Sequence, residues 1–429
     1  MRSSTLYFGW LRTGLLRRAM TSQIRIAFRD YADFEHALAE EARLFEAQTP
    51  GTRVELVPLN IHTLHHEAIA GGGLRDGCFD LALLVTDWLA EGMAAGALED
   101  LLPWHALAPL PDWPGGWARS LVRPLLFGDR LSSIPWHDGP ECLVYRSDLF
   151  SDSVRCTEFA ARFGRVLSPP RTWSEFEEVA RFFTDHAANV YGTVFAALPD
   201  GHNTLYDFVL QLWSRGGELA DAAGRPQLTT SQAIASLDFY RRIVRDASLC
   251  HTAARTVDST GSGELFLAGQ VAMMANWFGF AARAARPGSP LEGRVGIAPV
   301  PASPGCAPVS LSVFWALGMG SGSRNKETAW KFLRFVASAE RDLGITRHGA
   351  VGTRLSTWRD AALQAAVPCY REIERISLGA RTLPSGPATA AFASVLDGVI
   401  LRALDTDDSS TLILTEAQQQ IDSKGLVLL

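Results

Sequence analysis

The chain has 429 residues, of which 47% are hydrophobic and 20% charged, a globular composition that excludes wholesale disorder. Its 40 lysines and arginines against 46 aspartates and glutamates give a net charge of -6, which argues against the basic surface that nucleic-acid binding requires. A chain of this length exceeds what one compact core accommodates, so we expect two lobes. No apolar run reaches the roughly 18 residues that a membrane span needs.

Residues 1–23 form an N-terminal extension of unclear role before the first predicted strand. Their apolar stretch at 6–11 is short and ends at Arg12. A secretory signal needs a longer apolar run followed by a small-residue cleavage site. We therefore expect no export signal here, and translation starts at either Met1 or Met20.

The next part of the chain alternates between strand and helix patterns. Strands are indicated by alternating or continuous apolar residues, and helices by apolar residues every three or four positions. The predicted strands are 24–28, 54–58 and 81–85, and the predicted helices are 32–48, 63–70 and 87–95. This order predicts an open, mostly parallel sheet with helices packed on it.

The rest of the chain shows the same two patterns in a less regular order. Further predicted strands are 131–135, 141–145, 191–197, 271–275, 295–299 and 314–319. Further predicted helices are 173–183, 205–214, 231–247, 263–267, 326–337, 357–365, 387–403 and 415–423. We predict crossings between the lobes near 131–145, 309–314 and 350. The N-terminal lobe is then 24–134 plus about 312–349, and the C-terminal lobe is about 135–311 plus 350–429.

Motifs for catalysis or for a cofactor are absent or incomplete in the sequence. The six cysteines show no zinc spacing, so we expect free thiols or at most one disulfide. His62, His65 and His66 share a predicted helix face beside Glu67, which we interpret as a solvated face because a zinc site needs further ligands. The glycines at 318–322 lack the spacing of a dinucleotide fingerprint. We expect no metal, no cofactor and no enzymatic activity.

Several segments together resemble the family 1 extracellular solute-binding proteins of ABC importers, the maltose- and sugar-binding group. The most specific is LFLAGQVAMMANW at 265–277, followed by NKETAWKFL at 325–333. Further similar segments are 45–51, 79–91, 134–136, 143–150 and 169–176. The resemblance runs from about Ile24 to Ile421. It implies a two-lobed α/β fold of the periplasmic-binding-protein type II, in which each lobe is an open, mostly parallel sheet flanked by helices, with a hinge between.

Charged, amide and aromatic side chains follow the predicted strands at their carboxyl ends. Open α/β sheets bind ligands at this edge, so we predict that these side chains contact a ligand. They are Arg29, Asp30, Asp87, Trp88, Trp136, Asp138, Asn203, Tyr206, Asn276 and Trp277. Carboxylates and amides hydrogen-bond to vicinal hydroxyl groups, and aromatic faces stack on the C–H face of a sugar ring.

The resemblance implies ligand contacts at most of these positions and adds Arg381 in the C-terminal part. Other interpretations of the same residues stay open. Asp30 and Asp87 both precede predicted helices, so each could be a helix N-cap. For Trp136 and Trp277 the alternative is packing in the core.

The resemblance implies a substrate-binding component of an ABC-type importer. Such a protein captures a carbohydrate or polyol by hinge closure, performs no chemistry, and delivers the ligand to ABC permease subunits. A sugar acid is a further option if Arg29 and Arg381 both reach the cleft, because arginine binds carboxylates bidentately. We expect a monomer that works in the periplasm or outside the cell. Without a visible export signal, the alternative is a cytoplasmic ligand sensor of the same fold that acts on a regulator.

Overall fold

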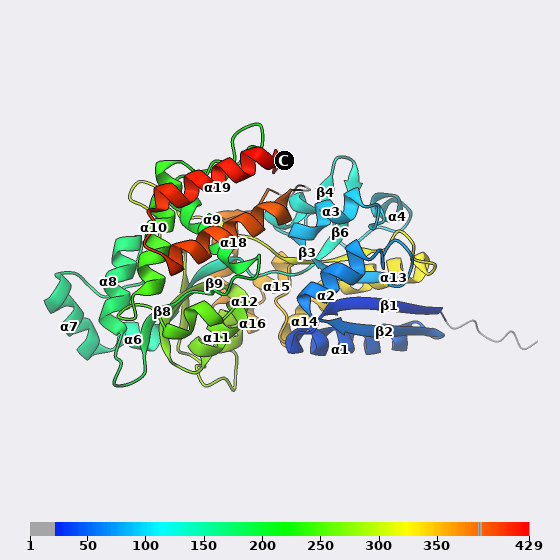
Figure 1. Ribbon diagram of the computed structural model, residues 1–429. Helices are drawn as coiled ribbons and strands as arrows, with labels where there is room; N and C mark the ends of the chain where they lie inside the picture. The colour runs from blue at the N-terminus through cyan, green and yellow to red at the C-terminus, as the bar shows by residue number, and fades with distance from the viewer. Residues whose placement is uncertain (1–21, 385, 387, 429) are drawn as a thin grey trace, which may run out of the picture.

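The computed structural model describes residues 22–384, 386 and 388–428. Met1, Met20 and most of the predicted extension 1–23 lie outside the described residues. Figure 1 shows two lobes side by side, with the beginning of the described chain in one and the middle of the chain in the other. In the part that the structure describes, the helices are too short or too polar to cross a lipid bilayer.

The first lobe contains a five-stranded sheet with the strand order β2-β1-β3-β12-β6. Its strands are β1 (Ser22–Arg29), β2 (Thr52–Leu59), β3 (Leu81–Val85), β6 (Ser133–His137) and β12 (Trp315–Met319). β1 is parallel to β2 and β3, whereas β12 is antiparallel to β3 and β6, so β12 alone runs in the reverse direction. The central strand β3 is buried along its whole length, which explains its uninterrupted apolar sequence.

Helices α1 (Ala32–Gln48) and α13 (Lys326–Val336) pack against this sheet, and α14 (Ala339–Arg347) packs against both of these helices. α1 buries Phe34, Leu38 and Phe45, which recur at helical spacing on its inner face. Residues 326–347 therefore belong with the first lobe although they follow the whole second sheet in sequence.

The second lobe contains a four-stranded sheet with the strand order β10-β7-β9-β8. Its strands are β7 (Glu141–Arg146), β8 (Tyr191–Val194), β9 (Val271–Trp277) and β10 (Val295–Ala298). β8 and β9 are parallel, and β7 is antiparallel to both β9 and β10. Each sheet thus has one reversed strand among parallel ones, which agrees with the prediction of mostly parallel sheets.

The helices of the second lobe surround this sheet and include α18, which reaches from the second lobe towards the first in Figure 1. They are α6 (Ser147–Ser151), α7 (Ser153–Phe163), α8 (Trp173–Phe183), α9 (Asn203–Trp213), α10 (Ser231–Arg245), α11 (Ser259–Leu267), α12 (Phe278–Ala285), α17 (Tyr370–Leu378), α18 (Thr389–Asp405) and α19 (Ser410–Lys424).

Short elements complete the described chain. They are α2 (Ile61–His65), a π-helix (His66–Ala70), a 3-10 helix (Thr86–Trp88), α3 (Leu89–Ala94), α4 (Leu102–Leu107), α5 (Arg119–Val122), a 3-10 helix (Arg123–Leu125), β4 (Leu126–Phe127), β5 (Arg130–Leu131), a 3-10 helix (Thr252–Thr256), β11 (Ser310–Leu311), α15 (Leu355–Trp358), α16 (Ala361–Ala366) and β13 (Ala380–Arg381).

The chain passes between the lobes at three connections. The first is the segment between β6 and β7, since β6 pairs with β12 as far as His137 and β7 begins at Glu141 in the other sheet. The first-lobe sheet therefore extends past the predicted boundary at residue 134, and we now propose the boundary at 138–140. The second connection joins β10 to β12, and the third follows α14, where the backbone N–H of Val351 bonds to the His137 ring.

Some predicted elements have the observed bounds and others differ for local reasons. The predicted helices 32–48 and 173–183 and the predicted strand 81–85 match residue for residue. α8 begins at Trp173 because the Thr172 side chain accepts the backbone N–H of Glu175 as an N-cap. The predicted helix 357–365 is wrong as a single element, because the Asp360 side chain caps a new helix by accepting the N–H of Leu363.

Candidate functional site

A cleft lies between the lobes, at the carboxyl ends of β1 and β3, and encloses about 140 Å³. We call it the main cleft. The first lobe lines it with Arg29, Tyr31, Phe34, Ile61, His62, Val85, His137 and Trp315. The second lobe lines it with Asp200, His202, Asn203, Tyr206, Asp258, Ser259, Thr260, Trp277, Gly279 and Phe280. Gly139, Val313 and Gly349 come from the connections between the lobes. This is the edge where open α/β sheets bind ligands.

Aromatic side chains form much of the wall of the main cleft. Tyr31, Trp277 and Phe280 line it and are partly exposed. Tyr206 is buried and meets the Trp277 ring edge-on, with 5.5 Å between the ring centroids. Trp315 is also buried, so both lobes support aromatic faces with packed side chains behind them. The main cleft therefore presents rigid flat surfaces rather than flexible side chains.

His137 supplies a hydrogen-bond donor with a defined orientation. Its Nδ1 accepts the backbone N–H of Val351 at 2.8 Å. Burial, followed by the nearby charge of Arg29, lowers the pKa of His137 to about 3, so the ring is neutral at physiological pH. In a neutral imidazole whose Nδ1 accepts, the proton is on Nε2. A Cβ placed on Gly279 would lie 3.8 Å from that Nε2, so the donor lies beside the part of the cleft wall formed by Gly279.

The N-termini of two second-lobe helices line the main cleft. The Asp200 carboxylate accepts the backbone N–H groups of His202 at 2.9 Å and Asn203 at 2.8 Å, where α9 begins. The Asp258 carboxylate accepts the N–H of Gly261 at 2.8 Å and so caps α11. Both carboxylates combine capping with a position on the cleft wall, where they also offer acceptors to a ligand.

Asn276 positions the beginning of α11 without lining the cleft. Its Nδ2 donates to the backbone carbonyl of Ser259 at 3.0 Å and to the Ser262 hydroxyl at 3.0 Å. Ser259 in turn lines the main cleft. Asn276 therefore acts on the cleft through Ser259.

Among the described residues, a hydrogen bond and an ion pair between side chains join the lobes beside the main cleft. The Tyr206 hydroxyl, from α9, donates to the Asp87 carboxylate, from the end of β3, at 2.7 Å. Burial raises the pKa of Asp87, while the Tyr206 hydrogen bond acts in the opposite direction. The second contact is an ion pair between Arg286 and Asp33 at 3.5 Å. Both contacts must break for the lobes to separate.

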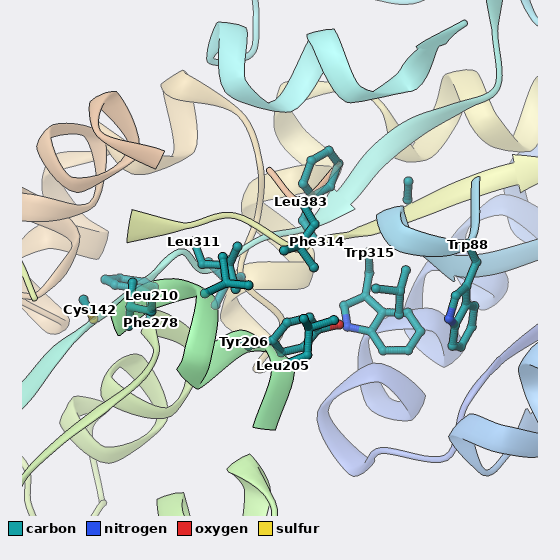
Figure 2. Close-up of a cluster of buried hydrophobic side chains, with 14 of the residues drawn as sticks. Trp88, Cys142, Leu205, Tyr206, Leu210, Phe278, Leu311, Phe314, Trp315 and Leu383 are labelled. Carbon is teal, nitrogen blue, oxygen red and sulfur yellow. The ribbon is translucent and has the colours of Figure 1, made fainter. Parts of the chain in front are cut away.

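A second cavity, which we call the second chamber, adjoins the main cleft and encloses about 450 Å³. Ile61, His62, Asp200 and His202 line both spaces. The second chamber is completed by His65, Asp87, Trp88, Glu91, Gly201, Leu205, Gly386, Thr389, Ala390, Ala393, Ser394 and Asp397. In Figure 2, Tyr206 points towards Trp315, and Trp88 lies on the far side of Trp315. In the described part of the chain, His, Cys, Asp and Glu do not gather in groups of three or more that would suit a metal ion.

The structure brings six of the eleven residues predicted to contact a ligand to these two spaces. Four of them line the main cleft, namely Arg29, Asn203, Tyr206 and Trp277. Two of them line the second chamber, namely Asp87 and Trp88. The N-cap alternative for Asp87 is wrong, because its carboxylate accepts the Tyr206 hydroxyl instead of a helix N–H.

The other five predicted residues do not line either space. Asn276 lies behind Ser259, as described above. Asp30 is exposed and is not the N-cap of α1, which begins after Tyr31. Trp136 is 2% exposed and packs edge-on against Phe34 at 5.3 Å, so the core-packing alternative holds for it.

The remaining two of these five residues are charged. Asp138 is 1% exposed within the first connection between the lobes, where burial raises the pKa of its carboxyl to about 7. Arg381 stacks on Trp213, with 4.2 Å between the guanidinium carbon and the ring centroid, and pairs with Glu218. Arg381 is thus held by a neighbouring ring and carboxylate, and the predicted pair of arginines in the cleft does not form.

Several cleft residues were not predicted from the sequence. Asp258, Phe280 and Trp315 lie at helix starts or at the start of a strand, and His62 was interpreted as part of a solvated histidine face. Asp258 offered one usable signal, since an aspartate directly before a glycine- and serine-rich helix start is a typical N-cap. The others become neighbours only when the two lobes are placed together.

Two α/β lobes joined by several connections, with an aromatic and polar cleft between them, define a two-lobed ligand-binding protein. The profile of the family described as bacterial extracellular solute-binding protein matches residues 29–341. The chain belongs to this family, which consists of binding proteins rather than enzymes.

Two relatives of known description match over most of the chain. A Deinococcus radiodurans protein, described as a probable ABC transporter-binding protein, is 23% identical over 283 residues, which are 65% of this chain and 64% of the relative. The chain thus spans slightly less than two thirds of that relative. A binding protein of Brucella abortus (strain 2308) is 24% identical over 327 residues, 75% of this chain and 74% of the relative.

Solved structures with the same fold confirm the predicted fold class. The maltose-bound MalE3 of T. maritima superimposes with a TM-score of 0.81 at 23% identity, covering 94% of this chain and 100% of that one. A solute-binding protein of Agrobacterium radiobacter K84 in complex with ribitol gives 0.82 at 22% identity, covering 94% and 98%. One from Agrobacterium vitis S4 with bound D-mannitol gives 0.80 at 18% identity, covering 94% and 98%. At these identities the similarity establishes the two-lobed fold.

Proposed function

We propose that the chain is the substrate-binding component of an ABC-type importer. It captures a carbohydrate or polyol in the main cleft as the lobes close, and delivers it unchanged to a membrane permease. The observation that carries this proposal is the combination of partly exposed aromatic faces, Tyr31, Trp277 and Phe280, with directed polar groups from both lobes.

The polar groups of the main cleft match the hydrogen-bonding needs of hydroxyl groups. The His137 Nε2–H is a fixed donor, and the Asp200 and Asp258 carboxylates are acceptors. A hydroxyl group both donates and accepts, so neighbouring hydroxyls of a sugar satisfy the two kinds of partner together. The aromatic faces remove the C–H surfaces of the ligand from water.

An uncharged ligand fits the main cleft better than a sugar acid. Arg29 is the single lysine or arginine among the described residues that line it, and Arg381 is engaged with Glu218. The described lining of the main cleft therefore lacks the two arginines that would bind a ligand carboxylate together. The solved structures with maltose, ribitol and D-mannitol support a polyhydroxylated ligand for this fold.

Closure is proposed to occur about the connections between the lobes. Opening would break the Tyr206–Asp87 hydrogen bond and the Arg286–Asp33 ion pair and would expose Trp277 and Phe280 to water. A ligand that contacts both lobes binds the closed form more tightly than the open form, so it shifts the equilibrium towards closure.

The family description supports a location outside the cytoplasmic membrane. We propose that the protein works there as a monomer, with ABC permease subunits as its partners. This setting suits a protein that binds a solute and passes it on without converting it.

Isothermal titration calorimetry with a panel of polyols and disaccharides tests the proposal. We expect micromolar or tighter binding of at least one compound, about -8 kcal/mol or more favourable. Small-angle X-ray scattering should show a smaller radius of gyration when that compound is bound. A protein that binds no member of the panel, or that converts a bound compound into product, would contradict the proposal.

A further inference from the structure

The second chamber adjoins the main cleft and shares part of its wall. It encloses about 450 Å³ against about 140 Å³ for the main cleft, and the two spaces share Asp200 and His202 in their common wall. Tyr206 lines the main cleft and its hydrogen-bond partner Asp87 lines the second chamber, so this contact lies between the two spaces. The second chamber is therefore placed to receive one end of a ligand that begins in the main cleft.

The second chamber differs from the main cleft in its charge. It is lined by four carboxyl groups, Asp87 and Glu91 from the first lobe and Asp200 and Asp397 from the second. No lysine or arginine lines it among the described residues, and its other titratable side chains are histidines, His62, His65 and His202. A neutral sugar in this space would leave the acidic groups without a counter-charge.

The contacts of these carboxyl groups include no lysine or arginine among the described residues. Asp87 accepts the Tyr206 hydroxyl, Asp397 accepts the Thr204 hydroxyl, Glu91 is 2.8 Å from the His65 ring, and Asp200 accepts two backbone N–H groups. Burial raises the pKa of Asp87 and of Asp397, and a cation bound beside them would favour their charged forms. Asp405 is a useful contrast, because this aspartate on the same helix as Asp397 is paired with Arg255.

We propose that the second chamber binds a protonated amine carried by the ligand whose hydroxylated part lies in the main cleft. The ligand is then an amino sugar or an amino polyol rather than a neutral one. The inference rests on the proposed function, since it assumes a polyhydroxylated ligand in the main cleft. The Trp88 ring, which lines the second chamber, adds an aromatic face that suits a cation.

The test uses pairs of compounds that differ only in the amine. Suitable pairs are D-glucitol with 1-amino-1-deoxy-D-glucitol, and cellobiose with the disaccharide of β-1,4-linked glucosamine. Calorimetry with the full-length protein at pH 7.5 should show that, in at least one pair, the amino compound binds at least tenfold more tightly than the neutral compound. The affinity of the amino compound should weaken as the pH falls from 8 to 5, because Asp87 and Asp397, whose pKa values burial raises, gain protons and lose their attraction for the amine.

Two variants assign the effect to the second chamber. Glu91→Gln and Asp397→Asn each remove a charge and keep the shape, and each should reduce the preference for the amine severalfold while leaving the affinity for the neutral compound within twofold. Asp405→Asn is the matched control, because it removes the same charge from the same helix at an exposed ion pair. It should leave both affinities unchanged.

The outcomes separate this inference from the proposed function. If the neutral and amino compounds bind equally, or if Glu91→Gln and Asp397→Asn weaken both compounds of a pair alike, the amine site is refuted and the carbohydrate-binding function stands. If neither compound of any pair binds, the proposed function is contradicted and the amine site with it. A circular dichroism spectrum equal to that of the unmodified protein establishes that each variant is folded.

Discussion

The main cleft and the second chamber share one wall but differ in what they offer to a ligand. The main cleft has partly exposed aromatic faces, a neutral histidine, and one arginine beside the carboxylates of Asp200 and Asp258. The second chamber has four carboxyl groups, one of them the shared Asp200, and no lysine or arginine among the described lining residues. Aromatic faces bind C–H surfaces, and uncompensated carboxyl groups bind cations. We infer that the main cleft selects the ligand by shape and aromatic stacking, and that the second chamber selects it by charge.

The largest expected effect comes from filling the main cleft. Gly279 lines it, and a Cβ there would approach His137 Nε2 and Val351 to 3.8 Å without a severe clash. A leucine in place of Gly279 should therefore occupy ligand space and weaken binding of any panel compound at least 100-fold, as measured by calorimetry. Gly279→Ala is a control that introduces a smaller side chain, and it should weaken binding less. Unchanged affinity in Gly279→Leu would mean that the ligand binds elsewhere.

The second prediction compares two tryptophans at strand ends. Trp277 lines the main cleft and is partly exposed, whereas Trp136 is 2% exposed in the core. Trp277→Ala should weaken binding by about 2 kcal/mol, roughly 30-fold, through the loss of a stacking face. Trp136→Phe should instead lower the free energy of unfolding by about 1–2 kcal/mol with little change in affinity. Calorimetry measures the affinity, and urea denaturation measures the free energy of unfolding. A large loss of affinity in Trp136→Phe with none in Trp277→Ala would contradict the placement of these side chains.

The third prediction concerns the contact between the two spaces. Tyr206→Phe removes the hydroxyl that donates to Asp87 and should weaken binding by about 1–2 kcal/mol, because the closed form loses a hydrogen bond and the carboxyl group loses a partner. Tyr240→Phe is a matched control, since Tyr240 donates to the buried Asp207 at 3.0 Å within the second lobe. The control should lower the melting temperature without changing the affinity. If Tyr206→Phe and Tyr240→Phe change the affinity equally, the Tyr206–Asp87 hydrogen bond has no special role in holding the lobes together.

The smallest effect on binding is expected at Asp138, which lies outside both spaces. Burial raises the pKa of its carboxyl from 3.8 to about 7, so the folded state holds the proton more tightly than the unfolded state does. Its contribution to stability is therefore full below about pH 4 and is lost as the pH rises towards 7, with a slope of at most about 1.4 kcal/mol per pH unit. Asp138→Asn should flatten this part of the pH dependence of the melting temperature and leave ligand affinity unchanged. A loss of ligand affinity in Asp138→Asn would show instead that Asp138 contributes to the binding site.

The sequence predicts the elements of this protein better than it predicts the site. Strand β3 and helices α1 and α8 follow from continuous or periodic apolar residues and from local caps, and these signals act over a few residues. The site depends on which strand ends face each other across two lobes. Arg381 shows the limit, because its attachment to Trp213 joins residues that are far apart in sequence.

A crystal structure of the protein with its tightest-binding panel compound would show directly where the ligand binds. The proposed function predicts the compound between the lobes, with a hydroxylated face against Trp277 or Tyr31 and a hydroxyl within about 3 Å of His137 Nε2. For an amino compound, the amine should lie in the second chamber beside Asp397 or Glu91. A compound bound to the outer face of either lobe, with the main cleft empty, would contradict the account.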